Sequence, residues 1–249
     1  MLIDFAVLSD RGERPVNEDC VGTASLENKH IFVLADGLGG HSNGEIASRL
    51  VTEKIIEFLT DENAEKETFL EDAFLHAQKK LLEEQKKHGA SYEMKTTAVV
   101  LFIDGGQVSF GHIGDSRLYL IRKGKIVSRT LDHSVPQMLA ISGEIREKDI
   151  RHHEDRNRLL RAMGNDWNPE RPEYRIDEKN LSIDKNNCFL LCSDGFWEWI
   201  TEKQMQRVLK KNLSAENQLR KMTDIVLKNG KGKKMDNYSA ILVKIKEPD

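Results

Sequence analysis

The chain has 249 residues, of which 39% are hydrophobic and 32% are charged, a balance that supports a sizeable core and excludes general disorder. Its 38 basic residues face 41 acidic ones, for a formal net charge of -3. The sequence therefore lacks the basic excess that is typical of a dedicated nucleic-acid-binding protein.

The same survey predicts one cytoplasmic domain over residues 1–249 and no membrane segment. No apolar run approaches the ~18 residues of a membrane span, and the first residues lack a secretory signal. The three cysteines, Cys20, Cys188 and Cys192, are an odd and small number. They fit a reducing cytoplasm better than a disulfide scaffold.

The first 90 residues predict three strands followed by two helices. The strands are expected over 4–9, 20–25 and 30–35, and their short connectors predict antiparallel pairing among all three. Apolar residues at helical spacing predict helices over 43–59 and 67–86, with a polar break between them. Two long helices between groups of strands indicate a helical layer that covers a sheet.

The middle of the chain predicts successive hairpins. Strands are expected over 96–103, 107–113, 117–121 and 125–130, with Asp104-Gly105-Gly106 as a strong hairpin turn. Hairpins in series favour antiparallel sheets and exclude a Rossmann-type fold.

The remainder predicts a mixture of short elements. A short helix is expected over 134–141, a polar surface insertion over 142–157, a helical turn over 159–163, and strands over 173–176, 187–192 and 238–245. Thr201 and Gln204 match a capping box that starts a helix to about residue 212, and Ser214 caps another. Together these elements predict one domain with two antiparallel sheets and flanking helices.

Carboxylates at strand ends and tight turns are the candidate chemistry. They are Glu18, Asp19, Asp36, Asp115, Asp194 and Asp236. If the strands pack together, these groups converge and repel one another, so the site needs cations, and oxygen ligands favour Mg²⁺ or Mn²⁺. Two such ions can activate a water and clamp a phosphoryl group, and Arg14 suits the phosphate. On spacing alone, however, an Asp before Gly is more often a plain turn residue.

The sequence resembles the metal-dependent protein phosphatases of the 2C type, in their compact bacterial form. The matching segments are SDRGERPVNED (9–19), VLADGLGGH (33–41), TTAVV (96–100), GHIGDSRLY (111–119), LDHS (131–134), RNRLLRAMG (156–164), LLCSDGFWEWI (190–200) and DNYSAILV (236–243). Each segment is weak by itself, but the eight occur in family order over most of the chain.

The resemblance implies an α+β fold, a four-layer αββα sandwich of two antiparallel sheets flanked by helices. It also implies hydrolysis of phosphoserine and phosphothreonine by direct attack of a metal-bridging water. By resemblance, Asp36 bridges two Mn²⁺ or Mg²⁺ ions with the Gly37 carbonyl as a further ligand. Asp194 and Asp236 are implied as ligands of the first ion, and Glu18 belongs to the second.

Further roles follow from the same resemblance. Asp19 is expected to hydrogen-bond metal-bound water, and Arg14 to hold the substrate phosphate. Asp115 is expected to hold a weaker third ion together with Asp194. Glu198 stands near that third ion, where many relatives carry Asp.

Two features of the resemblance concern the surroundings of the site. Residues 142–157 fall where the family has a mobile flap beside the active site. Leu38 stands where animal relatives carry a His proposed as general acid, so the proton donor is not assigned. His41 is close in sequence to Asp36 and also receives no role.

The partners implied are phosphoproteins and, in a bacterium, a Ser/Thr kinase whose action the enzyme opposes. No nucleic acid and no membrane partner is expected, and the chain is expected to be a monomer. One alternative is a phosphoprotein- or metal-sensing module of the same fold with little turnover. Another is a phosphatase of small phosphate esters.

Overall fold

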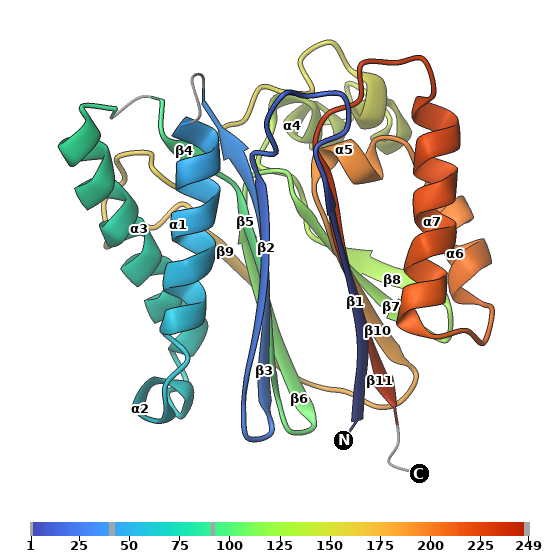
Figure 1. Cartoon of the computed structure of the whole chain (residues 1–249), viewed down its shortest axis with the longest axis horizontal. Coiled ribbons are helices and arrows are strands. Elements are labelled where there is room, and N and C mark those ends of the chain that lie inside the picture. The colour runs from blue at the N-terminus through green and yellow to red at the C-terminus, as the bar shows by residue number, and fades with distance from the viewer. Residues whose placement is uncertain (1, 40–42, 91–92, 247–249) are drawn as a thin grey trace.

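In the computed structural model, which describes residues 2–39, 43–90 and 93–246, two antiparallel sheets face each other between two helical layers (Figure 1). The five-stranded sheet has the order β1 (Leu2–Asp10), β11 (Tyr238–Lys246), β10 (Asn187–Cys192), β7 (Arg117–Arg122) and β8 (Lys125–Arg129). The second sheet has the order β2 (Asp19–Leu26), β3 (Lys29–Leu38), β5 (Ala98–Asp104), β6 (Gln107–Ile113) and β9 (Arg175–Ser182), with β4 (Lys95–Thr96) paired to β3. The α+β sandwich is confirmed.

The sheets are held together by an apolar layer that follows from the period-two alternation of strand side chains. In β5, Val99, Leu101 and Ile103 face the five-stranded sheet, whereas Val100 lies in the core on the opposite face. Leu101 is fully buried in the central strand of its sheet. Because β5 is buried on both faces, its apolar run is continuous.

Helices cover the outer face of each sheet. On the second sheet lie α1 (Asn43–Glu57) and α3 (Phe69–His88), which are connected through the short helix α2 (Asp61–Ala64). On the five-stranded sheet lie α6 (Glu202–Leu209) and α7 (Ala215–Gly230) (Figure 1). Buried residues recur at helical spacing, as in Ala47, Val51 and Ile55 of α1. Within the described part of the chain, no helix is long and apolar enough to cross a bilayer.

The Thr201 capping box is confirmed at the start of α6. The backbone amide of Thr201 donates to Gln204 Oε1 at 2.9 Å, and the backbone amide of Gln204 donates to Thr201 Oγ1 at 3.3 Å. The helix ends at Leu209, three residues before the predicted limit.

The predicted pairing of the first three strands is wrong for β1. This strand pairs with β11, whereas β2 pairs with β3 in the other sheet. The polar segment 11–18 therefore passes from one sheet to the other instead of forming a hairpin. β3 also continues beyond the predicted end at residue 35, because β4 pairs with Gly37 and Leu38.

Several short elements also differ from the sequence predictions. The predicted helical turn over 159–163 is absent: Leu159 and Met163 form isolated bridges to Ser134 and Thr96. Strand β9 starts at Arg175 and ends at Ser182, and the polar break after α1 contains the short helix α2. A further short helix that the sequence did not predict, α5, covers Asp194–Trp197.

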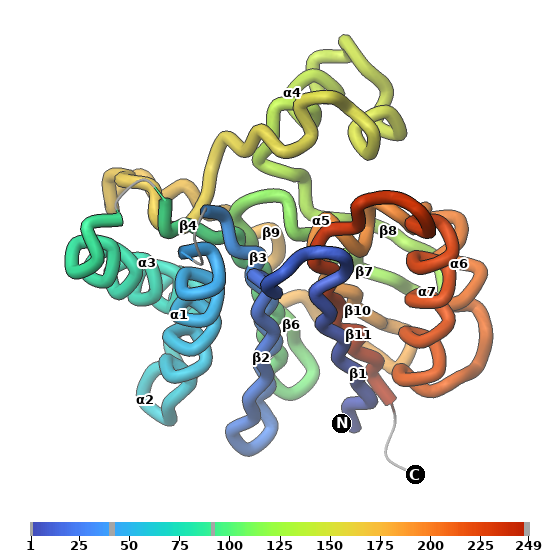
Figure 2. Tube along the Cα trace, turned by 45° about the horizontal axis from the view of Figure 1, so that its top comes forward, coloured from blue at the N-terminus to red at the C-terminus, as the bar shows by residue number. Residues whose placement is uncertain are grey.

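The insertion 142–157, called the flap below, follows α4 (Val135–Ile141) and contains the 3₁₀ helix η1 (Glu147–His152). Figure 2 shows α4 and this segment rising beyond the ends of both sheets. Ile150 and Arg151 are buried, so the prediction of a purely surface segment is wrong at these two residues. These buried side chains anchor one side of the flap.

The layer between the sheets gives a test of stability. Leu101→Ala is expected to lower the free energy of unfolding by about 2–5 kcal/mol, because it leaves a cavity in a closely packed interface. Leu227→Ala, at an α7 position that is 44% exposed, is the matched control and should change it little. Urea unfolding measures both. Equal effects in the two variants would contradict the assigned core.

Candidate active site

A cavity of about 210 Å³ lies among the ends of strands from both sheets. Seven predicted site residues line it: Arg14, Glu18, Asp36, Gly37, Asp115, Asp194 and Asp236. Leu38, Gly39, Asn157, Leu159 and Asn237 complete the wall. The structure thus brings together residues separated by more than 200 positions in the sequence, while Asp19 and Glu198 lie outside the wall.

Pairing of β2 with β3 builds one side of the cavity. Asp19 lies opposite Asp36 in the strand register, and the Gly37 amide donates to the Glu18 carbonyl oxygen at 3.0 Å. An added Cβ at Gly37 would lie 2.2 Å from the Gly44 carbonyl oxygen, so glycine lets the start of α1 approach. Two acids and a candidate carbonyl ligand are therefore positioned by backbone pairing.

The backbone of Asp36 is further fixed by two threonines. Its amide donates to Thr97 Oγ1 at 2.9 Å, and its carbonyl oxygen accepts from Thr96 Oγ1 and from the Thr97 amide, both at 2.8 Å. Thr97 Oγ1 in turn lies 2.7 Å from Ser116 Oγ, next to Asp115. These bonds leave the Asp36 carboxyl group free to face the cavity.

Pairing of β10 with β11 builds the opposite side. The Ser193 amide donates to the Ser239 carbonyl oxygen at 3.1 Å. Asp194 therefore lies just after the end of β10, and Asp236 lies just before the start of β11, where these two strands are paired. Asp194 is the first residue of α5. An added Cβ at Gly195 would meet the Asn237 carbonyl oxygen at 2.1 Å, so this close approach requires glycine.

Asn237 is a site residue that sequence reasoning missed. Its Nδ2 donates to the carbonyl oxygens of Arg11 and Val16, both at 2.9 Å, and its Oδ1 accepts from the Glu18 amide at 2.8 Å. The Asn237 side chain therefore binds both ends of the segment that contains Arg14. Because Asn237 follows Asp236 directly, this segment is held close to Asp236. The available signal was its place in the DNYSAILV segment.

Asp19 lies behind the cavity and is almost fully buried. Its Oδ2 accepts from Ser193 Oγ at 2.8 Å, but its Oδ1 has no hydrogen-bond partner in the described structure. Burial, with the charges of Asp194 and Asp236, raises the pKa of Asp19 to about 7. An orphaned buried carboxylate oxygen suits a water or cation, because leaving such an atom unpaired is costly.

The other buried acids show the same shortage of positive charge. Burial and the neighbouring Asp236 raise the pKa of Asp194 to about 7. Burial and nearby carboxylates also raise the pKa values of Asp36 and Asp115 well above the ordinary range. Without compensating cations, these like charges therefore favour the protonated forms of the carboxyl groups.

This donor set fits hard divalent cations. Every candidate side-chain ligand is a carboxylate, and oxygen donors of this kind favour Mg²⁺ and Mn²⁺. Within residues 2–39, 43–90 and 93–246, no three His, Cys, Asp or Glu side chains are arranged with the geometry of a complete metal site. Arg14 Nη2 instead contacts Asp236 Oδ2 at 2.6 Å and neutralises this predicted ligand.

The residues predicted around the third ion and at the proton-donor position lie in different places. Asp115 lines the cavity, whereas Glu198 does not: its Oε1 pairs with Arg156 Nε of the flap at 2.8 Å. Leu38 also lines the cavity and supplies no ionisable group. His41 lies outside the described residues, so the proton donor is not assigned to a side chain.

Residues 9–237 match the family model described as Protein phosphatase 2C. The chain is 31% identical over 209 residues to "Serine/threonine phosphatase stp" of Listeria monocytogenes, an alignment that covers 81% of each protein. The solved serine/threonine phosphatase Stp1 from Staphylococcus aureus is 27% identical, with a TM-score of 0.85 and coverage of 99% of this chain and 96% of that one.

A second solved structure is informative about metals. The catalytic domain of the serine threonine protein phosphatase PstP, in complex with 2 manganese ions, is 25% identical to this chain with a TM-score of 0.82. The match covers 98% of this chain and 99% of that domain. The oxygen-rich cavity described above is consistent with metal binding of this kind.

The raised pKa values predict how stability depends on pH. Asp19 and Asp194 have pKa values of about 7 in the folded protein against an ordinary 3.8, so the folded state binds more protons between these limits. Stability of the metal-free protein should therefore fall as pH rises through this window. We expect the Tm in EDTA to fall between about pH 5 and about pH 8.

Divalent ions should reverse this dependence, because they bind the deprotonated carboxylates. Mn²⁺ is expected to raise the Tm more at about pH 8 than at about pH 5. Asp194→Asn, which removes one of the titrating groups, should flatten the curve in EDTA. A Tm that rises with pH in EDTA and ignores Mn²⁺ would contradict the electrostatic account.

Proposed function

Since the chain belongs to the protein phosphatase 2C family, we propose that it hydrolyses phosphoserine and phosphothreonine side chains of proteins with the help of divalent metal ions. The observation that carries this proposal is the single cavity lined by Glu18, Asp36, Asp115, Asp194 and Asp236 together with Arg14. A cluster of carboxylates with one guanidinium is suited to cations and a phosphate at the same place.

We assign the central roles as follows. Asp36 would be a ligand of both Mn²⁺ or Mg²⁺ ions, with the Gly37 carbonyl as a further ligand. Asp194 and Asp236 would hold the first ion, and Glu18 would hold the second. When bound, the ions supply an activated water and neutralise charge on the phosphoryl group. A weaker third ion is proposed at Asp115.

The remaining polar groups would orient substrate and solvent. Arg14 is 56% exposed at its side chain and can turn from Asp236 toward a phosphate, which a guanidinium binds through two parallel hydrogen bonds. Asp19 has one oxygen fixed by Ser193, and its free oxygen would accept a hydrogen bond from water. Asn237 would keep the Arg14 segment in register with Asp236.

The cellular setting is also a proposal. The free thiols of Cys20, Cys188 and Cys192 support a reducing cytoplasm. We propose a monomer of one catalytic domain, with the flap at 142–157, that acts on phosphoproteins and opposes a Ser/Thr kinase. A sensing module with little turnover is not favoured, because all five carboxylates predicted as metal ligands, Glu18, Asp36, Asp115, Asp194 and Asp236, line the cavity.

The direct test is turnover of a phosphothreonine peptide by the purified protein. Activity should disappear in EDTA and return with Mn²⁺ or Mg²⁺, and Asp194→Ala should lower kcat/KM by about 100-fold or more through loss of a metal ligand. Asp224→Ala, at an exposed α7 position, is the matched control and should retain activity.

Three outcomes would oppose the proposal in different ways. Full activity of Asp194→Ala would remove this residue from the metal site. Tight phosphopeptide binding without phosphate release would support a sensing module. Faster hydrolysis of small phosphate esters than of phosphopeptides would favour a metabolite phosphatase.

A further inference from the structure

A second polar cavity, of about 370 Å³, lies between the flap and the five-stranded sheet. Its wall consists of Arg117 of β7, Arg129 of β8, Glu202 of α6, and Glu147, Lys148 and Arg151 of η1. None of these residues lines the carboxylate cavity described above. Four cations thus face two carboxylates, in contrast to the acidic active site.

Three of the cations are arginines that are withdrawn from solvent. The side chains of Arg117, Arg129 and Arg151 are only 3%, 9% and 10% exposed. Arg117 forms a two-bond pair with Asp132, through Nε to Oδ1 at 2.8 Å and Nη2 to Oδ2 at 2.7 Å. Even with Asp132 counted, one positive charge in the wall has no matching carboxylate.

Two cationic groups of the flap have unused donors. Arg151 Nη2 donates to Glu202 Oε1 at 2.7 Å, but its buried Nη1 has no partner in the described structure. A buried guanidinium amine without an acceptor is costly and uncommon. Lys148 is exposed and forms no hydrogen bond or ion pair with the described residues. Arg151 Nη1 and the Lys148 ammonium group can therefore each accept a further partner.

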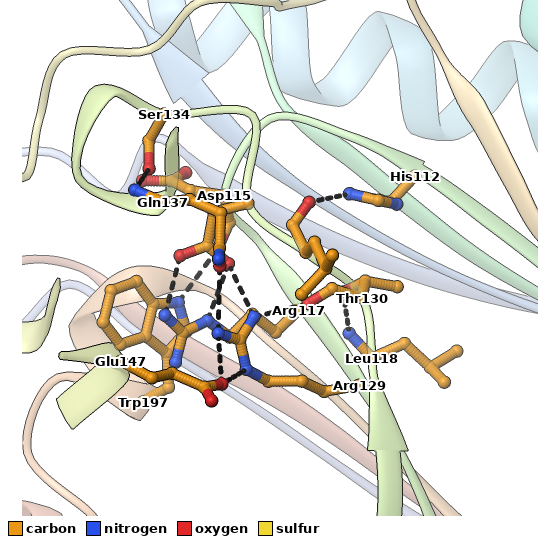
Figure 3. Close-up of polar contacts among 12 residues, drawn as sticks. His112, Asp115, Arg117, Leu118, Arg129, Thr130, Ser134, Gln137, Glu147 and Trp197 are labelled. Carbon is orange, nitrogen blue, oxygen red and sulfur yellow. Dashed lines mark hydrogen bonds and ion pairs between the residues drawn. The ribbon is translucent and has the colours of Figure 1, made fainter. Parts of the chain in front are cut away.

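We propose that this cavity is an anion site that binds a phosphate group. Arginines bind phosphate through paired hydrogen bonds, and Lys148 adds a mobile charge at the rim. Glu147 of the flap is the internal competitor: its Oε1 accepts from Arg129 Nη2 at 2.8 Å and from Arg129 Nε at 3.1 Å (Figure 3). Because Glu147 is 70% exposed, it can give way to an external anion.

Occupation of this site would fasten the flap to the sheet. A phosphate that reaches Lys148 and Arg151 on one side and Arg129 on the other bridges the two elements directly. The same wall adjoins the active site: Arg117 lies 3.5 Å from the ring centre of Trp197, whose Nε1 donates to the Asp115 carbonyl oxygen at 3.0 Å (Figure 3). The anion site is therefore one packed layer away from a predicted metal ligand.

The test is calorimetric titration of the Mn²⁺-loaded protein with inorganic phosphate. We expect two phosphate sites in the unaltered protein, of which one is the active site and is identified by the competitive Ki of phosphate in the hydrolysis assay. Lys148→Ala should weaken the second site about fivefold, and Glu147→Gln should tighten it by a similar factor, because the two side chains have opposite effects on the anion.

Charge-matched variants outside the cavity serve as controls. Lys203→Ala and Glu154→Gln remove exposed charges from α6 and the flap without changing the cavity wall. Neither should alter the second dissociation constant, and none of the four variants should alter the competitive Ki. Opposite shifts in Lys148→Ala and Glu147→Gln cannot arise from loss of folding, which would weaken binding in both.

A second experiment distinguishes a phosphate group of the substrate from free inorganic phosphate as the ligand. If the group belongs to the substrate, a doubly phosphorylated peptide should have a lower KM than its singly phosphorylated form, and Lys148→Ala should abolish the difference. If the group is the free ion, the two peptides should have equal KM values while the second calorimetric site persists. A single phosphate site, unchanged in all variants, would overturn the proposal.

Discussion

Mutual repulsion among buried carboxylates is the constraint on which this structure depends. Asp19, Asp36, Asp115 and Asp194 are held where the two sheets meet, and burial together with neighbouring charge raises the pKa of each. A flexible segment would relieve this repulsion by moving apart. Here the acids are carried by paired strand ends, whose hydrogen bonds make such separation costly.

The packing around the acids shows how the repulsion is tolerated. Asn237 fixes the segment that carries Arg14, and the Thr96–Thr97 pair fixes the backbone of Asp36. On the other side, Trp197 connects Asp115 to Arg117 (Figure 3). Arg117 in turn forms a buried ion pair with Asp132. The packing and hydrogen bonds of the fold thus hold the carboxylates in an unfavourable arrangement, and bound cations can relieve it.

The sequence was informative where local pattern and geometry coincide. Alternating strands, helical spacing and the Thr201 capping box predicted the sandwich and most of its elements, and the family segments selected seven residues that line one cavity. The partner of β1 was not predictable, because a short polar connector can close a hairpin or cross between sheets. Asn237 and the Arg156–Glu198 ion pair were missed since both are contacts between distant segments.

The pairing of β1 with β11 has a consequence for the order of events during synthesis. Asp236 is the second residue before β11, the last described strand, whereas Glu18 directly precedes β2 and Asp36 lies in β3. A nascent chain that has not yet released β11 from the ribosome therefore lacks the strand that joins β1 to β10, and it lacks one acid of the candidate site. The candidate site can therefore be completed only after β11 and the residues before it have been synthesised.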